Sequence, residues 1–254
     1  MSFNIAKVEA LVWDIGGTVF DWHNTIKKEI SELAKLQSKD INATNFTNKW
    51  RHKMFELLKP VRNHTAPWKN ADQLHFEALE IVLNEFDWKM TLKEKKELNT
   101  IWHKLNAWQD APKNIEKLRS RFKVTVLTVL SLKIAILSSK HNNISWDMIF
   151  SCEFLGHYKP DIKSYQKASE LLGLHPEQVM MCAAHENDLD AAKKAGLRTA
   201  YVHVPEELEA VMSHYQLTKE VIGLNDKISG KIPDNGAYDI VAKDFNDLSK
   251  KLLI

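Results

Sequence analysis

Short apolar runs alternate with helix-length amphipathic stretches through the second half of the chain, from Ala111 onward. The runs have the length and the β-branched or aromatic residues of buried strands, and most are followed by a stretch with a helical apolar period. Such alternation predicts right-handed β-α-β units and therefore a parallel sheet. The expected strands are 122–128, 148–152, 179–184, 199–204 and 238–243, and the expected helices are 112–121, 129–141, 163–174, 188–196 and 245–253.

A further strand, residues 8–13, precedes a long segment that shows only helical patterns. We expect no strand from His23 to Trp108, a helix over 46–61 whose end Pro60 weakens, and a capping box at Thr91 of the helix over 91–105. The expected fold is α/β, with a Rossmann-like parallel-sheet core formed by residues 1–21 and 109–254. The expected insertion is an all-helical cap, residues 22–108. The segment 223–236, broken by glycine and proline, is expected to be a loop.

Polar side chains follow several of the expected strands at their carboxyl ends. Asp14 follows the first strand, Thr128 ends the second, Lys159 lies after the third, and His185 and Asp188 come after the fourth. Ligands of open α/β sheets bind beyond the carboxyl ends of the strands. The sequence therefore predicts that these residues share one site.

The stretches around these residues resemble the haloacid dehalogenase superfamily, and more closely its 2-haloacid dehalogenase branch. HYKPD followed by AAHENDLDAAKKAGLRTA is a specific combination, whereas DIGGT alone is a weak signal. The matching stretches run in the expected order over nearly the whole chain: ALVWDIGGTVFDW, WRHK, APWKNADQLH, ISWDMIFSCEFLGHYKPDIKSY, LLGLHPEQVMMCAAHENDLDAAKKAGLRTAYV and YDIVAKDF.

The resemblance implies that Asp14 is a nucleophile. An aspartate is ionised at neutral pH, since its usual pKa is ~3.9, and can displace halide from a saturated carbon to form an ester. Phosphatases of the superfamily place a second aspartate two residues later as a general acid, and Gly16 cannot transfer a proton. The dehalogenase branch usually has an aromatic residue there, so Gly16 leaves open a wider pocket for bulkier 2-haloacids. Ile15 and Gly16 are expected beside the substrate.

Two basic residues match the family pattern as well. Lys159, in HYKPD, is expected to pair with Asp14 and to supply the positive charge for which phosphatases use magnesium. Arg51, in WRHK, corresponds to the cap arginine that receives the departing halide, since a guanidinium presents several donors from a fixed plane.

Two hydroxyl residues compete for the end of the second core strand. Ser138 would leave too little chain for the ~12-residue crossover that a parallel connection needs, whereas Thr128 leaves room for a helix that includes IAIL. In the family a serine and an asparagine hold the substrate carboxylate at this place. Here they are replaced by Thr128 and Val129, which puts carboxylate affinity in question.

The segment AAHENDLD supplies the last two candidates. By resemblance, Asp188 supports the lysine and the attacking water. His185, as a neutral imidazole near Asp14, is a candidate general base for the water that cleaves the ester. The alternative to this catalytic role is that His185 only caps backbone groups at the start of the following helix.

The expected function is hydrolysis of a small 2-haloacid anion by water to a 2-hydroxy acid, with no cofactor. A magnesium-dependent phosphatase of the same superfamily is the alternative, and so is a non-catalytic relative, because Gly16, Val129 and Ala184 depart from the pattern. A sugar kinase of the actin-like class also opens with DIGGT but needs more glycine-rich loops than the eight glycines of this chain provide.

Composition limits the partners that we expect. A formal net charge of +2 gives no nucleic-acid or membrane surface, and no apolar run reaches the ~20 residues of a membrane helix. Cys152 and Cys182 are expected as buried free thiols of a cytoplasmic protein with no signal peptide. The resemblance also implies that the protein forms a homodimer.

Overall fold

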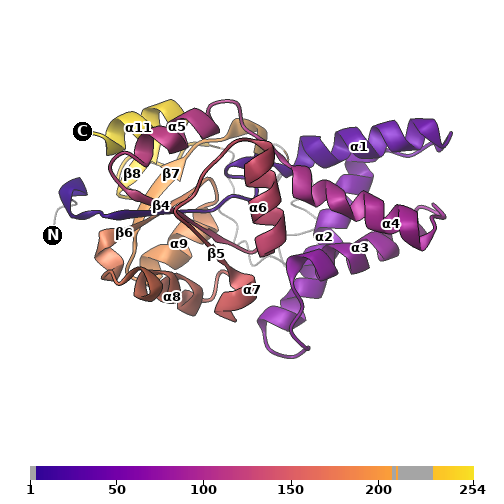
Figure 1. Ribbon diagram of the computed structural model, residues 1–254, viewed down its shortest axis with the longest axis horizontal. Coiled ribbons are helices and arrows are strands. Elements are labelled where there is room, and N and C mark those ends of the chain that lie inside the picture. Colours follow the sequence, from indigo (N-terminus) through magenta and orange to yellow (C-terminus); the bar gives the residue numbers. More distant parts are fainter. Residues whose placement is uncertain (1–3, 208–209, 211–230) are drawn as a thin grey trace.

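A six-stranded parallel sheet forms the core of the computed structural model, which describes residues 4–207, 210 and 231–254 (Figure 1). The strand order is β5-β4-β1-β6-β7-β8, and every neighbouring pair is parallel. The predicted α/β fold is confirmed. The strands are β1 (Ala10–Trp13), β4 (Lys123–Thr128), β5 (Met148–Ser151), β6 (Val179–Ala183), β7 (Arg198–Val202) and β8 (Ile240–Ala242).

Helices cover the sheet on both sides. Because both faces of each strand are buried, the strands are continuous apolar runs in the sequence. All four residues of β1, at the centre of the sheet, are fully buried. In Figure 1, α5 and α11 lie together on one side, and α8 and α9 lie on the other. The helices of the core are α5 (Ala111–Leu118), α6 (Leu132–His141), α7 (Cys152–Leu155), α8 (Ile162–Leu172), α9 (Glu186–Lys194) and α11 (Phe245–Leu252), with the 3₁₀ helices η1 (Ile5–Lys7) and η3 (Pro176–Gln178).

The cap is the helical segment that follows β1 and lies beyond one end of the sheet (Figure 1). Its interior is aromatic: Phe46, Trp50, Trp88 and Trp102 are buried and pack edge to face. The capping box predicted at Thr91 is present. The cap helices are α1 (Trp22–Leu36), α2 (Ala43–Arg62), α3 (Ala71–Glu85), α4 (Leu92–Asn99) and the 3₁₀ helix η2 (Thr100–Lys104).

Several local predictions are wrong. A strand does occur between His23 and Trp108, because β3 (Asn106–Ala107) pairs antiparallel with β2 (Phe20–Asp21), and two residues are too few to show a period. The expected helix 91–105 is divided into α4 and η2. By contrast, the predicted helix 46–61 is present as α2, which continues through Pro60 to Arg62 because a proline in the last turn removes only one hydrogen bond.

The stretch IAIL is helical, as the crossover argument predicted. It lies in α6, whose N-cap Ser131 accepts a hydrogen bond from the Ile134 amide. Cys152 begins α7 and does not end a strand, while Cys152 and Cys182 are buried free thiols as expected. The predicted loop 223–236 lies outside the described residues up to position 230, and 231–236 is irregular. Among the described residues no helix is long and apolar enough to cross a membrane.

The strand order places a crevice at the end of β1. From β1 the chain continues to β4 and β5 on one side, then crosses to β6, β7 and β8 on the other. Loops that leave the sheet in opposite directions separate at such a switch point, and ligands bind there. Asp14 is the first residue beyond β1.

Candidate active site

Asp14 lies at the switch point, almost fully buried. Its amide donates to Cys182 O at 3.0 Å, which continues the pairing of β1 with β6. Its Oδ1 accepts from Lys159 Nζ at 2.9 Å, and its Oδ2 accepts from Thr18 Oγ1 at 2.6 Å and lies 3.2 Å from His185 Nδ1. Burial by itself would raise the pKa of Asp14, but the charges of Lys159 and His185 and their hydrogen bonds hold it well below its usual range. Asp14 is therefore a carboxylate.

Lys159 joins two carboxylates. Its Nζ lies 2.9 Å from Asp14 Oδ1 and 2.6 Å from Asp188 Oδ2, and the other oxygen of Asp188 accepts a hydrogen bond from the Tyr165 hydroxyl. Burial raises the pKa of Asp188, and the negative charge of Asp14 adds to this effect. A magnesium ion held by Asp14 and Asp188 would have to displace this ammonium group, so these residues do not fit that metal.

His185 is the N-cap residue of α9 and lies between two acids. Its Nδ1 faces Asp14, and its Nε2 lies 3.1 Å from Oε1 of Glu207, a carboxylate that is only 1% exposed. Burial would lower the pKa of His185, but Asp14 and Glu207 raise it to about 10. The free protein therefore carries an imidazolium at neutral pH, and the expected neutral imidazole is wrong for this state.

Arg51 extends from α2 of the cap into an aromatic cage. Its Cζ lies 4.6 Å from the centroid of Phe55, 4.9 Å from that of Trp22 and 5.8 Å from that of Trp102. Burial lowers the pKa of Arg51 to about 10, so it remains charged at neutral pH. Within the described part of the chain its buried Nη1 has no hydrogen-bond partner. A buried cationic donor of this kind suits a small anion.

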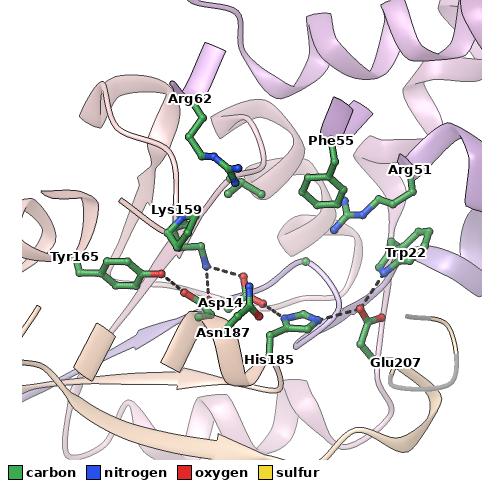
Figure 2. Close-up of a pocket in the computed structure, with 14 residues that line it drawn as sticks. Asp14, Trp22, Arg51, Phe55, Arg62, Lys159, Tyr165, His185, Asn187 and Glu207 are labelled. Atoms are coloured by element: carbon green, nitrogen blue, oxygen red, sulfur yellow. Dashed lines mark hydrogen bonds and ion pairs between the residues drawn. The ribbon is translucent and has the colours of Figure 1, made fainter. Parts of the chain in front are cut away.

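These groups enclose a cavity of about 110 Å³, small beside the ~300–1,000 Å³ of sites for drug-sized ligands. Figure 2 shows Arg51, Phe55 and Arg62 approaching from the cap, opposite Asp14 and Lys159 of the core. The cap thus forms one wall and the strand ends form the other. The lining residues are Asp14, Gly16, Trp22, Arg51, Phe55, Arg62, Val129, Lys159, Pro160, Tyr165, His185, Asn187, Asp188 and Glu207.

Two predicted contact residues do not line the cavity. Thr128 is 1% exposed, and its Oγ1 accepts from the Leu130 amide at 3.1 Å, so this hydroxyl shapes the loop after β4. Ile15 is fully buried in the apolar core, and its carbonyl accepts from the Val19 and Phe20 amides. The cavity is instead lined by their neighbours Gly16 and Val129.

Gly16 adopts no backbone conformation that requires glycine. A Cβ built there would meet Leu130 Cδ1 at 3.6 Å, an ordinary van der Waals contact. Gly17 differs, because its φ is +92° and a Cβ would overlap the Glu207 carboxylate. The second glycine of DIGGT is therefore the one that the backbone requires.

Several lining residues were not predicted. Phe55 and Arg62 follow Arg51 by four and eleven positions, spacings that share one helix face, so the period of α2 would have found them. Glu207 follows β7, at the same carboxyl edge of the sheet as the predicted site residues. Trp22 and Tyr165 carried no such signal, and neither did Thr18, which does not line the cavity but donates to Asp14 Oδ2.

Comparisons with known proteins identify the family and the fold. Residues 8–196 match the family of haloacid dehalogenase-like hydrolases. The chain is 27% identical over 205 residues to (S)-2-haloacid dehalogenase 4A of Burkholderia cepacia, an alignment that covers 78% of this chain and 84% of that one. Two solved structures are similar over nearly their whole length. The L-2-haloacid dehalogenase PA0810 is 28% identical, with a TM-score of 0.85 and coverage of 97% and 99%. The defluorinating L-2-haloacid dehalogenase Rha0230 is 27% identical, with a TM-score of 0.86 and coverage of 100% of both chains.

Proposed function

Since the chain belongs to the haloacid dehalogenase-like hydrolases, we propose that it hydrolyses short 2-haloacids to 2-hydroxy acids through an ester on Asp14. One observation carries the proposal: Lys159 Nζ forms ion pairs with both Asp14 and Asp188. Its positive charge stabilises the ionised form of the Asp14 nucleophile, a role that needs no metal. The named dehalogenases among its relatives support the same chemistry and the (S)-enantiomer as substrate.

In the first step, Asp14 Oδ1 attacks C2 of the haloacid from the side opposite the halogen. A C–O bond forms as the carbon–halogen bond breaks, so the configuration at C2 inverts. The halide carries away the bonding electrons and moves toward Arg51, whose Nη1 donates to it. Arg62 lines the same cavity, and its positive charge binds the substrate carboxylate in place of the amide that Val129 lacks.

In the second step, water attacks the Asp14 carboxyl carbon. Negative charge then develops on Oδ2, which already faces Thr18 Oγ1 and the His185 imidazolium, and these two donors stabilise it. Asp188, with its raised pKa, accepts the proton from water. The acyl–oxygen bond breaks, the 2-hydroxy acid takes one proton, and a second proton is released as Asp14 ionises again.

A phosphatase reaction has less support from the geometry. Gly16 supplies no acid for a leaving alcohol, and Lys159 occupies the place of a cation between Asp14 and Asp188. Hydrolysis of a chromogenic phosphate that appears only with magnesium would favour this alternative. The homodimer and the cytoplasmic location stay predictions.

The test is one turnover of excess protein with chloroacetate in ¹⁸O-labelled water. We expect release of one chloride per molecule of chloroacetate, and one ¹⁸O in the Asp14 peptide of each protein molecule that reacted, located by mass spectrometry. Asp14→Asn is the matched control and should release none. The panel includes fluoroacetate and both 2-chloropropionate enantiomers. Absence of halide release from every member would overturn the proposal.

A further inference from the structure

Two histidines and an aspartate meet on the surface, outside the cavity. They are His64, His157 and Asp161, and one potential ligand atom from each lies within 4.8 Å of the other two. His157 Nδ1 lies 3.0 Å from Asp161 Oδ2, and the His64 and His157 rings are 6.2 Å apart at 84°. Neither catalytic step uses any of these side chains.

The three residues come from different parts of the fold. His64 follows α2 in the cap, with a φ of +57° that is uncommon for a residue other than glycine. His157 and Asp161 lie between α7 and α8 of the core. The cluster therefore joins the cap to the core.

Neighbouring contacts hold these two segments against each other. Trp68 stacks on Tyr158 at 4.6 Å between centroids, and the Tyr158 hydroxyl donates to Lys69 O at 2.8 Å. Asn70 Nδ2 donates to Glu153 Oε1 at 2.7 Å. The two sides of the cluster are thus placed by contacts that do not involve its own members.

The donor set suits a transition metal. Imidazole and carboxylate ligands bind zinc at about 2.0–2.2 Å, and tetrahedral ligands at that distance lie ~3.4 Å apart. The His157–Asp161 separation is already close to this value, and the His64 nitrogen lies within 4.8 Å of both ligand atoms, so it needs to move by at most ~1.4 Å. His64 is exposed and the other two are half-buried, so a hydrated ion can reach the cluster and keep water as its remaining ligands.

We propose that His64, His157 and Asp161 bind one divalent transition-metal ion, zinc or copper, that clasps the cap to the core. The ion replaces the proton shared by His157 and Asp161 and adds His64 from the cap. Arg62 and Lys159, each two residues from a ligand, line the cavity, so the clasp fixes the cap wall over the site. The proposal does not depend on the dehalogenase reaction.

Binding is tested by calorimetric titration of the full-length protein with zinc chloride, after treatment with a chelator. We expect one equivalent to bind, and His64→Ala, His157→Ala and Asp161→Asn each to weaken it roughly tenfold or more. Asp161→Asn keeps the side-chain oxygen that caps α8. His175→Ala, at an exposed histidine outside the cluster, is the control and should bind as the parent does. Equal affinity in all five proteins, or no binding to the parent, would overturn the site.

Copper and hydrogen exchange test the geometry. Electron paramagnetic resonance of one equivalent of copper sulfate should show two nitrogen ligands in the parent and one in His64→Ala. Zinc should also slow amide exchange in residues 62–70 of the cap and 156–163 of the core together. Protection confined to the core segment would show that the ion does not join cap and core.

Discussion

Glu207 Oε1 lies 3.1 Å from His185 Nε2, on the side of the imidazole away from Asp14. The same oxygen accepts from Trp22 Nε1 at 3.1 Å, which fixes the carboxylate in a buried position against Gly17. Because both of its nitrogens face carboxylates, His185 keeps its second proton. When Asp14 becomes an ester its negative charge disappears, and Glu207 alone then maintains the imidazolium that faces the developing oxyanion.

Glu207→Gln should therefore move the alkaline limb of the pH–rate profile to lower pH. The amide keeps the shape of the side chain but removes one of the charges that raise the pKa of His185 to about 10. We expect halide release at pH 9 to fall roughly tenfold while the rate at pH 6.5 changes little. Glu206→Gln, at the exposed neighbouring carboxylate, should keep the parent profile. Identical profiles for both variants would show that Glu207 does not control this titration.

Stability should depend on the same histidine. The pKa of His185 is about 10 in the folded protein against an ordinary value of 6.5. His185 therefore binds a proton more tightly in the folded than in the unfolded protein, and its protonation stabilises the fold. This contribution to the free energy of unfolding is fully present below pH 6.5 and is lost as the pH rises through 10, a loss on the order of a few kcal/mol. Urea unfolding between pH 6.5 and 10 measures it. His185→Gln should flatten this decline, and parallel curves for the two proteins would contradict the assignment.

The core sheet could be predicted from the sequence because buried parallel strands leave long apolar runs. IAIL, read alone, resembles a strand, and only the length of the crossover showed it to be α6. The pair β2 and β3 could not be predicted, since antiparallel pairing of two residues depends on how the chain leaves and re-enters the core.

The candidate site was predictable where a residue follows a strand. Asp14, Lys159, His185 and Asp188 meet within hydrogen-bond distance because parallel strands end at one edge. Sequence position does not show which way a side chain points, so it predicts Thr128 beside the substrate although the Thr128 hydroxyl accepts from the loop after β4. The charge of His185 could not be read either, because it depends on distant Glu207.

Arg51→Lys should impair halide departure although it keeps the charge. A lysine ammonium has neither the flat face that packs between Trp22 and Phe55 nor the Nη1 donor. We expect kcat/KM for chloroacetate to fall about 100-fold and inhibition by added bromide to weaken. Arg119→Lys, at an arginine paired with Glu116 and Asp147 on the surface, is the control for the substitution itself. A fall of similar size in both variants would argue against a halide role.

Gly16→Ala should narrow the range of substrates. The new methyl group meets Leu130 at an ordinary contact distance, so the fold should tolerate it, and the unfolding temperature serves as the check. Gly16 lines a cavity of only about 110 Å³, so we expect the added methyl group to take space from it. We expect kcat/KM to fall about tenfold for 2-chlorobutanoate and to stay within about twofold for chloroacetate. An equal loss for both acids would mean that Gly16 does not limit substrate size.

Asp188→Asn should separate ester formation from ester hydrolysis. The amide retains an oxygen for Lys159 Nζ, so Asp14 can still displace chloride from chloroacetate, but it cannot accept a proton from water. We expect a burst of one chloride per molecule and a carboxymethyl group on the peptide that contains Asp14. His185→Gln keeps Asp188 as the base and Thr18 as a donor to Asp14 Oδ2, so its ester should form, decay more slowly than in the parent and still turn over. The opposite pattern, with ester trapped in His185→Gln and turnover preserved in Asp188→Asn, would make His185 the base. Intact-protein mass spectra taken at intervals after mixing distinguish the two assignments, because the added mass persists longest in the variant that lacks the base.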